Sequence, residues 1–340
     1  MISHSNNRNS ILDFIKLIAS FFVVLIHFSF TGILGNIFDA LARFAVPFFF
    51  AVAGFFSFGA EIKNIKKRIF KILFLYLFAS IIYHLYSLFI TIYSFGKASF
   101  FSYFVKTFSF ENFISFLFFN SPFSSDHLWF LLALVYVYLI WLLIIKFCKN
   151  DIFIFVLSTF LLVVHLILGE VLSIFGFQVK IEYVRNFALF GLPFFGFGYL
   201  INKHQNKFNN VNFYALILLL VFGCAESVLS NFFLGKNELY LGSICCCFSL
   251  IIIALKHSEK KLNRILTTIS STNTDIYIYH IVIAKSISFI LGLIGFPVTN
   301  LIFKNFLPIA VCIICIIFSL IKNFILSKLF KAQPYSNKKL

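Results

Sequence analysis

Lys16 and His27 lie eleven residues apart in an apolar segment near the start of the chain. In an α-helix, Lys16, Ser20 and His27 form one stripe, because eleven residues turn the helix only about 20° past three full turns and rise about 16 Å. Lysine supplies a cation that attracts anions, and histidine can accept a proton near neutral pH. The stripe predicts a cation near one end of a groove and an imidazole deeper in the membrane along the same groove. The competing interpretation is a Lys16 that only snorkels to the interface.

Other ionisable side chains also lie deep in apolar segments. An ionisable group at membrane depth is costly, so each one indicates a functional site by default. For His84 and His165, a neutral ring bonded within the protein is the simpler interpretation. Glu226 and Lys285 could neutralise one another if their helices touch. The full set of candidates besides Lys16 and His27 is His84, His165, Glu226, Tyr277, His280 and Lys285.

The composition excludes an ordinary soluble domain. Of the 340 residues, 61% are hydrophobic and only 12% are charged, about half of the 25% charged residues typical of soluble domains. The net charge of +16 does not indicate nucleic-acid binding, because the positive-inside rule accounts for an excess of Lys and Arg in cytoplasmic loops. We therefore predict an all-α polytopic membrane protein with one domain over residues 1–340.

Ten apolar segments approach the length of about 20 residues that a transmembrane helix needs. A further apolar stretch, 100–119, is interrupted by Lys106 and Glu111, which indicates a re-entrant or interfacial segment. Segments 44–60 and 186–201 are short for a membrane span. The ten predicted spans are 11–32, 44–60, 70–94, 127–147, 152–169, 186–201, 211–230, 239–256, 275–295 and 306–327.

The distribution of Lys and Arg predicts the orientation. With an even number of spans both termini lie on one side, and that side carries 19 of the 28 Lys and Arg residues against 7 on the other. The positive-inside rule then places both termini in the cytoplasm.

The cysteines do not predict a metal centre. Cys312 and Cys315 have the spacing of a metal or redox motif, but they lie in a fully apolar run without a second pair nearby. Packing between helices is the simpler interpretation, and we expect no metal.

The run from Asn9 to Phe30, NSILDFIKLIASFFVVLIHFSF, resembles the opening of the acyltransferase 3 family of integral membrane acyltransferases. In that family the first helix carries a basic residue, ten intervening residues and a histidine. The basic residue is usually arginine. Lys16 keeps the charge at this position but lacks the bidentate fork that suits phosphate.

Four further segments resemble motifs of the same family, and they occur in the family's order. The basic segment contains Arg68 and Lys71, two cations separated by two residues, although the proline that usually follows is missing. The second-helix segment has Ala53 where serine is common. The four segments are VPFFFAVAGFF from Val46, KKRIFKILFLY from Lys66, HLWFLLALVYVY from His127 and STNTDIYIYHIVI from Ser271.

The resemblance implies transfer of an acyl group, commonly acetyl from acetyl-CoA, to a hydroxyl of a surface glycan or of its lipid-linked precursor. It also implies a bacterial inner-membrane location. Lys16, Arg68 and Lys71 would then hold the CoA phosphates by charge. His27 would meet the thioester, either as the general base of a direct transfer or as a covalent carrier of the acyl group.

The resemblance also suggests supporting residues. Asp13, three residues before Lys16, is expected to pair with that cation and orient it. His127 and Trp129 would face the glycan acceptor, with a membrane-interface anchor as the alternative for Trp129. His280 follows Tyr277, a further possible supporting residue, by one turn near the cytoplasmic third of their helix. There His280 could contact CoA or only bond a neighbouring helix.

Two other classes of protein compete with an acyltransferase. A secondary transporter or flippase would also place His, Lys and Glu inside the membrane, but such proteins often show inverted repeats, and we find no repeat between the two halves of this sequence. A purely structural membrane subunit is disfavoured by the number of ionisable groups at depth. The acceptor, the acyl chain and the oligomeric state do not follow from the sequence.

Overall fold

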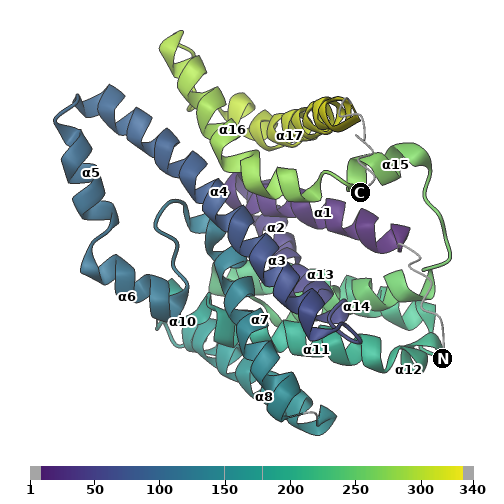
Figure 1. Cartoon of the computed structure of the whole chain (residues 1–340). Coiled ribbons are helices and arrows are strands. Elements are labelled where there is room, and N and C mark those ends of the chain that lie inside the picture. The colour runs from purple at the N-terminus through teal and green to yellow at the C-terminus, as the bar shows by residue number, and fades with distance from the viewer. Residues whose placement is uncertain (1–8, 149, 178, 332–340) are drawn as a thin grey trace, which may run out of the picture.

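The computed structural model describes residues 9–148, 150–177 and 179–331, and every regular element within these ranges is a helix (Figure 1). This confirms the predicted all-α membrane class. Arg8, Lys149, Lys338 and Lys339, which contributed to the charge distribution, lie outside the described residues. The cytoplasmic placement of both termini stays a prediction.

Eight helical stretches of the described chain are long and apolar enough to cross a membrane. Some of them join two or more helical elements end to end. The stretches are Ser10–His27 (α1), Gly32–Phe55 (α2, Gly32–Ala42, and α3, Ala45–Phe55), Ile62–Phe95 (α4), Asp126–Phe147 (a short turn and α7, Trp129–Phe147), Asp151–Ile174 (α8, Asp151–Leu166, a π-helical turn and α9, Leu172–Ile174), Phe213–Leu234 (α13), Asn273–Leu293 (α16) and Leu301–Leu329 (within α17, Leu301–Lys331).

The other two predicted spans correspond to shorter helices. Predicted span 239–256 is α14, Leu241–Lys256; its 16 residues make about 24 Å of helix, against a hydrocarbon core of about 30 Å. Predicted span 186–201 is a π-helical turn, Phe187–Gly191, followed by α11, Leu192–Lys203. The bundle thus combines eight long helices with two short ones.

The predicted boundary of span 44–60 was wrong. The helical stretch begins at Gly32 and ends at Phe55, because Asp39 does not end α2 and the chain becomes helical again after the two residues that follow α2. The side chains of Asp39 and Arg43 form an ion pair one helical turn apart, at 3.1 Å, and such an i, i+4 pair is compatible with a continuing helix. The backbone turns only between α2 and α3, around Arg43 and Phe44.

The segment predicted as re-entrant or interfacial forms two short helices, α5 (Ser99–Thr107) and α6 (Phe110–Phe119). Neither is long enough to span a membrane. Figure 1 shows them on an arm beside the bundle, at the far end of α4. The remaining short helices are α10 (Ile181–Val184), α12 (Gln205–Asn209) and α15 (Arg264–Ser270).

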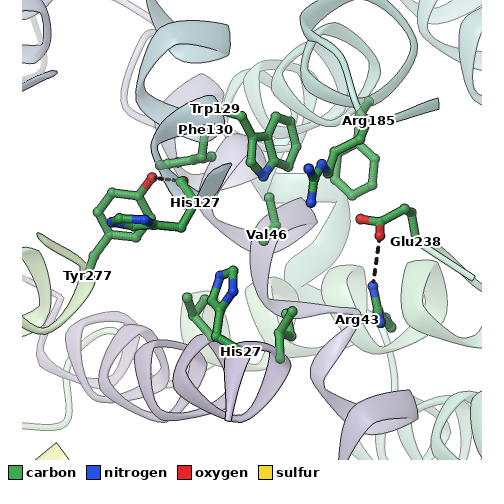
Figure 2. Close-up of a pocket in the computed structure, with 12 residues that line it drawn as sticks. His27, Arg43, Val46, His127, Trp129, Phe130, Arg185, Glu238 and Tyr277 are labelled. Atoms are coloured by element: carbon green, nitrogen blue, oxygen red, sulfur yellow. Dashed lines mark hydrogen bonds and ion pairs between the residues drawn. The ribbon is translucent and has the colours of Figure 1, made fainter. Parts of the chain in front are cut away.

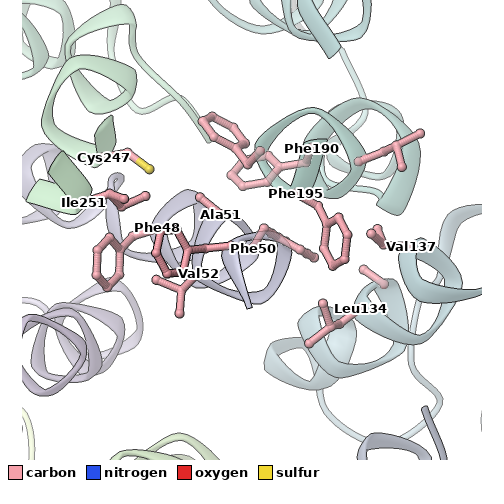
Figure 3. Close-up of a cluster of buried hydrophobic side chains, with 14 of the residues drawn as sticks. Phe48, Phe50, Ala51, Val52, Leu134, Val137, Phe190, Phe195, Cys247 and Ile251 are labelled. Atoms are coloured by element: carbon pink, nitrogen blue, oxygen red, sulfur yellow. The ribbon is translucent and has the colours of Figure 1, made fainter. Parts of the chain in front are cut away.

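Helix α3 forms the centre of the bundle. Its rings Phe48 and Phe50 are fully buried among side chains of α7, α11 and α14, as Figure 3 shows for Val137, Phe195 and Ile251. Helix α1 packs against α2, α3, α14, α15, α16 and α17. The helix that carries Lys16 and His27 is therefore held on several sides.

Two glycines let α3 and α11 approach each other closely. A Cβ atom added at Gly54 would lie 1.9 Å from the backbone oxygen of Phe195, and one added at Gly198 would lie 1.9 Å from that of Ala51. Small residues at such contacts are typical of membrane helix pairs, where close packing drives association.

We expect Gly198→Ala to destabilise the protein by at least the roughly 1–3 kcal/mol usual for overpacking, because the backbone of α3 must move away. The matched control is Gly292→Ala in α16, where an added Cβ meets no atom within 4 Å. Thermal unfolding in detergent measures both variants. Equal unfolding temperatures for the two variants would contradict the close contact between α3 and α11.

Candidate active site

Three histidine rings from distant parts of the chain meet inside the bundle. His27 ends α1, His127 lies in the turn before α7, and His280 is on α16. The ring centroids are 6.0 Å apart for His27 and His127, 5.3 Å for His27 and His280, and 5.1 Å for His127 and His280. The sequence pointed to each residue separately, and the fold brings them together.

The hydrogen bonds of His280 define its protonation. Its Nδ1 lies 3.0 Å from the carbonyl oxygen of Ile276 and 2.8 Å from that of Tyr277. A carbonyl oxygen only accepts, so Nδ1 carries the proton and Nε2 of the neutral ring is left with a free lone pair. Nε2 has no partner among the described residues, and the side chain is fully buried.

His127 is fixed from several directions. Its Nδ1 is 2.9 Å from the Ser125 hydroxyl, and its ring packs edge-on against Tyr83 with centroids 4.7 Å apart. The hydroxyl of Tyr277 donates a hydrogen bond to the His127 backbone carbonyl. Nε2 of His127 is buried and has no partner in the described part of the chain.

Of the three rings, only that of His27 is left without a hydrogen bond to any described residue at either nitrogen. It is also the one that is not fully buried. The His27 ring borders a small cavity of about 40 Å³ together with His127, Trp129, Arg43 and Arg185 (Figure 2). We call this space the histidine cavity. An unbonded imidazole beside a cavity is free to act on a bound molecule.

The sequence did not single out two cations of this cavity, Arg43 and Arg185. Arg43 is buried and pairs with Asp39 at 3.1 Å and with Glu238 at 3.2 Å. The Arg185 guanidinium lies 5.6 Å from the ring centroid of Trp129. Arg43 and Arg185 directly precede the predicted spans 44–60 and 186–201, so the predicted boundaries placed both arginines in loops. The Asp39, Arg43 spacing inside an apolar stretch was the available signal for a buried ion pair.

A second cavity, of about 330 Å³, brings together the three cations predicted to hold phosphates, Lys16, Arg68 and Lys71. We call it the basic cavity. Asn273 and Thr274, at the start of α16, contribute further polar groups to its lining. The expected pair between Lys16 and Asp13 is formed, at 3.0 Å.

The three cations of the basic cavity differ in their other contacts. Lys16 Nζ lies 5.1 Å from the centroid of the Phe56 ring. Arg68 donates to the backbone carbonyl of Phe56 at 2.8 Å, so it also satisfies a carbonyl at the end of α3. Lys71 is exposed and forms no ion pair with any described residue.

Phe130 and Tyr277 line both the basic cavity and the histidine cavity. These two side chains are therefore the wall between them. The Lys16 end of α1 faces one cavity and the His27 end faces the other, about 16 Å apart along the helix axis. A long molecule anchored at the cations would have to pass Phe130 and Tyr277 to reach His27.

A third cavity, of about 410 Å³, lies on the other side of the histidine cavity. We call it the outer cavity. Its lining includes Ser173, Lys236 and Asn237, and it shares Glu238 with the histidine cavity. The histidine cavity is thus bordered by two larger spaces on different sides.

Some predicted contacts are absent. His280 does not line the basic cavity, because its ring turns toward His27 and His127. Glu226 accepts hydrogen bonds from Ser230 and from the backbone of Gly242, whereas Lys285 is exposed, so the suggested pair of these two residues was wrong.

Trp129 is buried inside the bundle, between Phe50 and Phe190, so it is not an interface anchor. An anchor must reach the lipid headgroups at the edge of the bilayer. The indole instead lines the histidine cavity, next to Arg185.

With acetyl-CoA as the donor that the sequence resemblance implies, we expect Lys16→Ala to raise the Michaelis constant for that donor by about tenfold or more, the effect of losing one charge-assisted contact. Lys16→Arg should leave that constant unchanged or lower it, because arginine keeps the charge and its guanidinium can donate two parallel hydrogen bonds to a phosphate. Steady-state kinetics of the purified variants measure both. If both variants bind the donor like the parent, Lys16 is only a snorkelling residue.

The fold and the site define a class of protein: a multi-pass membrane protein whose histidines lie between a cationic cavity and a polar cavity. A family model described as an acyltransferase domain matches residues 9–327, nearly the whole chain. The chain belongs to this acyltransferase 3 family and is a membrane acyltransferase. No curated protein and no solved structure matches it significantly.

Proposed function

We propose that the protein moves an acetyl group from acetyl-CoA to a hydroxyl of a surface glycan or of its lipid-linked precursor. One observation carries the proposal: the wall of the cation-lined cavity, Phe130 and Tyr277, is also a wall of the cavity that holds His27. Family membership supports acyl transfer over a transporter or a structural subunit.

The basic cavity suits the donor. CoA is a polyanion with a long thin arm that ends in the thioester. Lys16, Arg68 and Lys71 would attract its phosphates by charge-assisted hydrogen bonds. The arm would then follow α1 inward past Tyr277, and the length of the stripe from Lys16 to His27 is comparable to that of the extended arm.

The histidine cavity suits the transfer step. In a direct transfer, the acceptor hydroxyl attacks the thioester carbonyl while His27 takes the hydroxyl proton; the new C–O bond forms, the C–S bond breaks, and the proton passes to the leaving thiolate. In a two-step transfer, a His27 nitrogen attacks the thioester carbonyl first, so that a C–N bond forms, the C–S bond breaks and CoA leaves as the thiolate. The acceptor hydroxyl then attacks the acyl-imidazole and loses its proton to a neighbouring base, the C–O bond forms and the C–N bond breaks.

The lone pairs of His127 and His280 beside His27 suit either route. In the two-step route, a neighbouring Nε2 could accept the proton that the acceptor hydroxyl loses. Intact-mass measurement after rapid quenching separates the routes, because only the two-step route adds an acetyl group to the protein.

The proposal also assigns a place and an orientation. We propose the bacterial inner membrane, with both termini in the cytoplasm. The basic cavity would then open toward cytoplasmic acetyl-CoA, and the outer cavity toward the opposite face, where surface glycans are assembled. The acyl group would cross part of the membrane between the two.

A labelling assay tests the function. Purified protein in detergent is incubated with acetyl-CoA labelled in the acetyl group and with cell-envelope glycans and glycolipids extracted from the source cells. The proposal predicts release of free CoA thiol and label on a glycan hydroxyl. Transport of such glycans in liposomes without any thiol release would favour the flippase instead.

A further inference from the structure

The charges around the histidine cavity almost cancel. Arg43 pairs with Asp39 and Glu238, and Lys236 Nζ lies 3.9 Å from Asp39. Two cations and two carboxylates thus form one network on the side of the cavity toward the outer cavity. Buried charges are tolerated when they are paired in this way.

Arg185 is the exception in this cavity. Its guanidinium lines the same space, yet no carboxylate of the described residues lies within 4.0 Å of it. Figure 2 shows the group beside the indole of Trp129, whereas Glu238 pairs with Arg43. A guanidinium stays protonated at any relevant pH. Arg185 is therefore a cation of the histidine cavity that has no carboxylate partner among the described residues.

The outer cavity offers a ligand a path to the Arg185 guanidinium. Arg185 directly follows Val184, the last residue of α10, and Val184 lines the outer cavity. Glu238 borders both spaces. A molecule that entered from the outer cavity would meet Arg185 and the indole face of Trp129 on its way to His27.

We propose that Arg185 binds an anionic group of the acceptor and so holds the neighbouring hydroxyl at His27. The inference rests on the proposed function and narrows its substrate class to acceptors with a negative charge near the modified hydroxyl. A guanidinium fork matches carboxylate and phosphate equally well. The anion is accordingly the carboxylate of an acidic sugar or the phosphate of a lipid-linked sugar.

Binding and kinetics with small probes test the inference. The probes are methyl glucuronide, glucose 1-phosphate and neutral methyl glucoside, each measured by equilibrium dialysis against the purified full-length protein. The parent should bind at least one anionic probe about tenfold or more tightly than the neutral one. The two anionic probes distinguish carboxylate from phosphate.

The variants are Arg185→Gln, Arg185→Lys and the matched control Lys180→Gln. Lys180 is exposed, carries the same charge five residues earlier and lines neither cavity. Arg185→Gln should abolish the preference for the anionic probe, Arg185→Lys should retain part of it, and Lys180→Gln should retain all of it. Thermal unfolding in detergent confirms that each variant is folded.

Two results would overturn the inference. One is a parent that binds no anionic probe better than the neutral one. The other is an Arg185→Gln variant that keeps the preference for the anion but loses thiol release with every acceptor, which would assign Arg185 to the oxyanion of the transfer step. If anion binding depends on Arg185 but acetyl-CoA releases no thiol with any acceptor, the proposed function fails and the anion site stands.

Discussion

Replacing His27 with alanine or glutamine is expected to lower acetyl transfer by roughly a hundredfold or more, the usual effect of losing a general base. The variant should remain folded, because the His27 ring makes no hydrogen bond to any described residue and borders a cavity. The measurement is the rate of thiol release from acetyl-CoA at saturating donor. A two-step transfer predicts the same loss, since the acyl carrier is gone.

The matched control for His27 is His84→Ala. His84 is also a histidine at membrane depth, but its Nδ1 is 2.9 Å from the Tyr103 hydroxyl and its side chain does not line the histidine cavity. It should keep the activity of the parent. Near-normal turnover in His27→Gln, or an equal loss in His84→Ala, would remove His27 from the reaction.

The second large effect is expected at the basic cavity. The double variant Arg68→Gln, Lys71→Gln should weaken CoA binding by about a hundredfold or more, because each of the two charge-assisted contacts contributes about 1.5–3 kcal/mol. Calorimetry measures the affinity. Arg68 also donates a hydrogen bond to the Phe56 carbonyl at the end of α3, so its replacement removes a structural contact as well as a charge. The single variant Lys71→Gln removes a charge of the basic cavity without breaking that contact.

The control for the double variant is Lys66→Gln, Lys67→Gln. It removes the same charge from the same helix end, yet both residues are exposed and neither lines the basic cavity. If these charges serve only the orientation of the protein, the two double variants should behave alike. Unchanged CoA affinity in a correctly oriented Arg68, Lys71 variant would leave Lys16 as the one proposed phosphate contact.

The helical class and the α1 stripe could be predicted from the sequence because both depend on local periodicity. Hydrophobic runs of about 20 residues identify membrane helices directly, and the helical repeat fixes the relation of Lys16 to His27. The Asp13 pair followed from the same repeat.

The composition of the cavities could not be predicted in this way. Whether His280 turns toward CoA or toward His27 depends on the rotation of α16 against α1, and no pattern within one helix determines it. Asp275 of α16 accepts hydrogen bonds from Ser319 and Lys322 of α17. This contact between two helices is likewise not encoded by a pattern within one helix. Arg43 and Arg185 were missed because both lie just before predicted spans, in expected loops, whereas long-range contacts bury Arg43 and aim Arg185 inward.

A structure of the protein with an uncleavable acetyl-CoA analogue, in which a methylene group replaces the thioester sulfur, tests the proposed transfer most directly. We expect the phosphates among Lys16, Arg68 and Lys71, the arm between Phe130 and Tyr277, and the carbonyl group within hydrogen-bonding reach of His27. Phosphates bound outside the basic cavity, or an acyl end remote from His27, would contradict it.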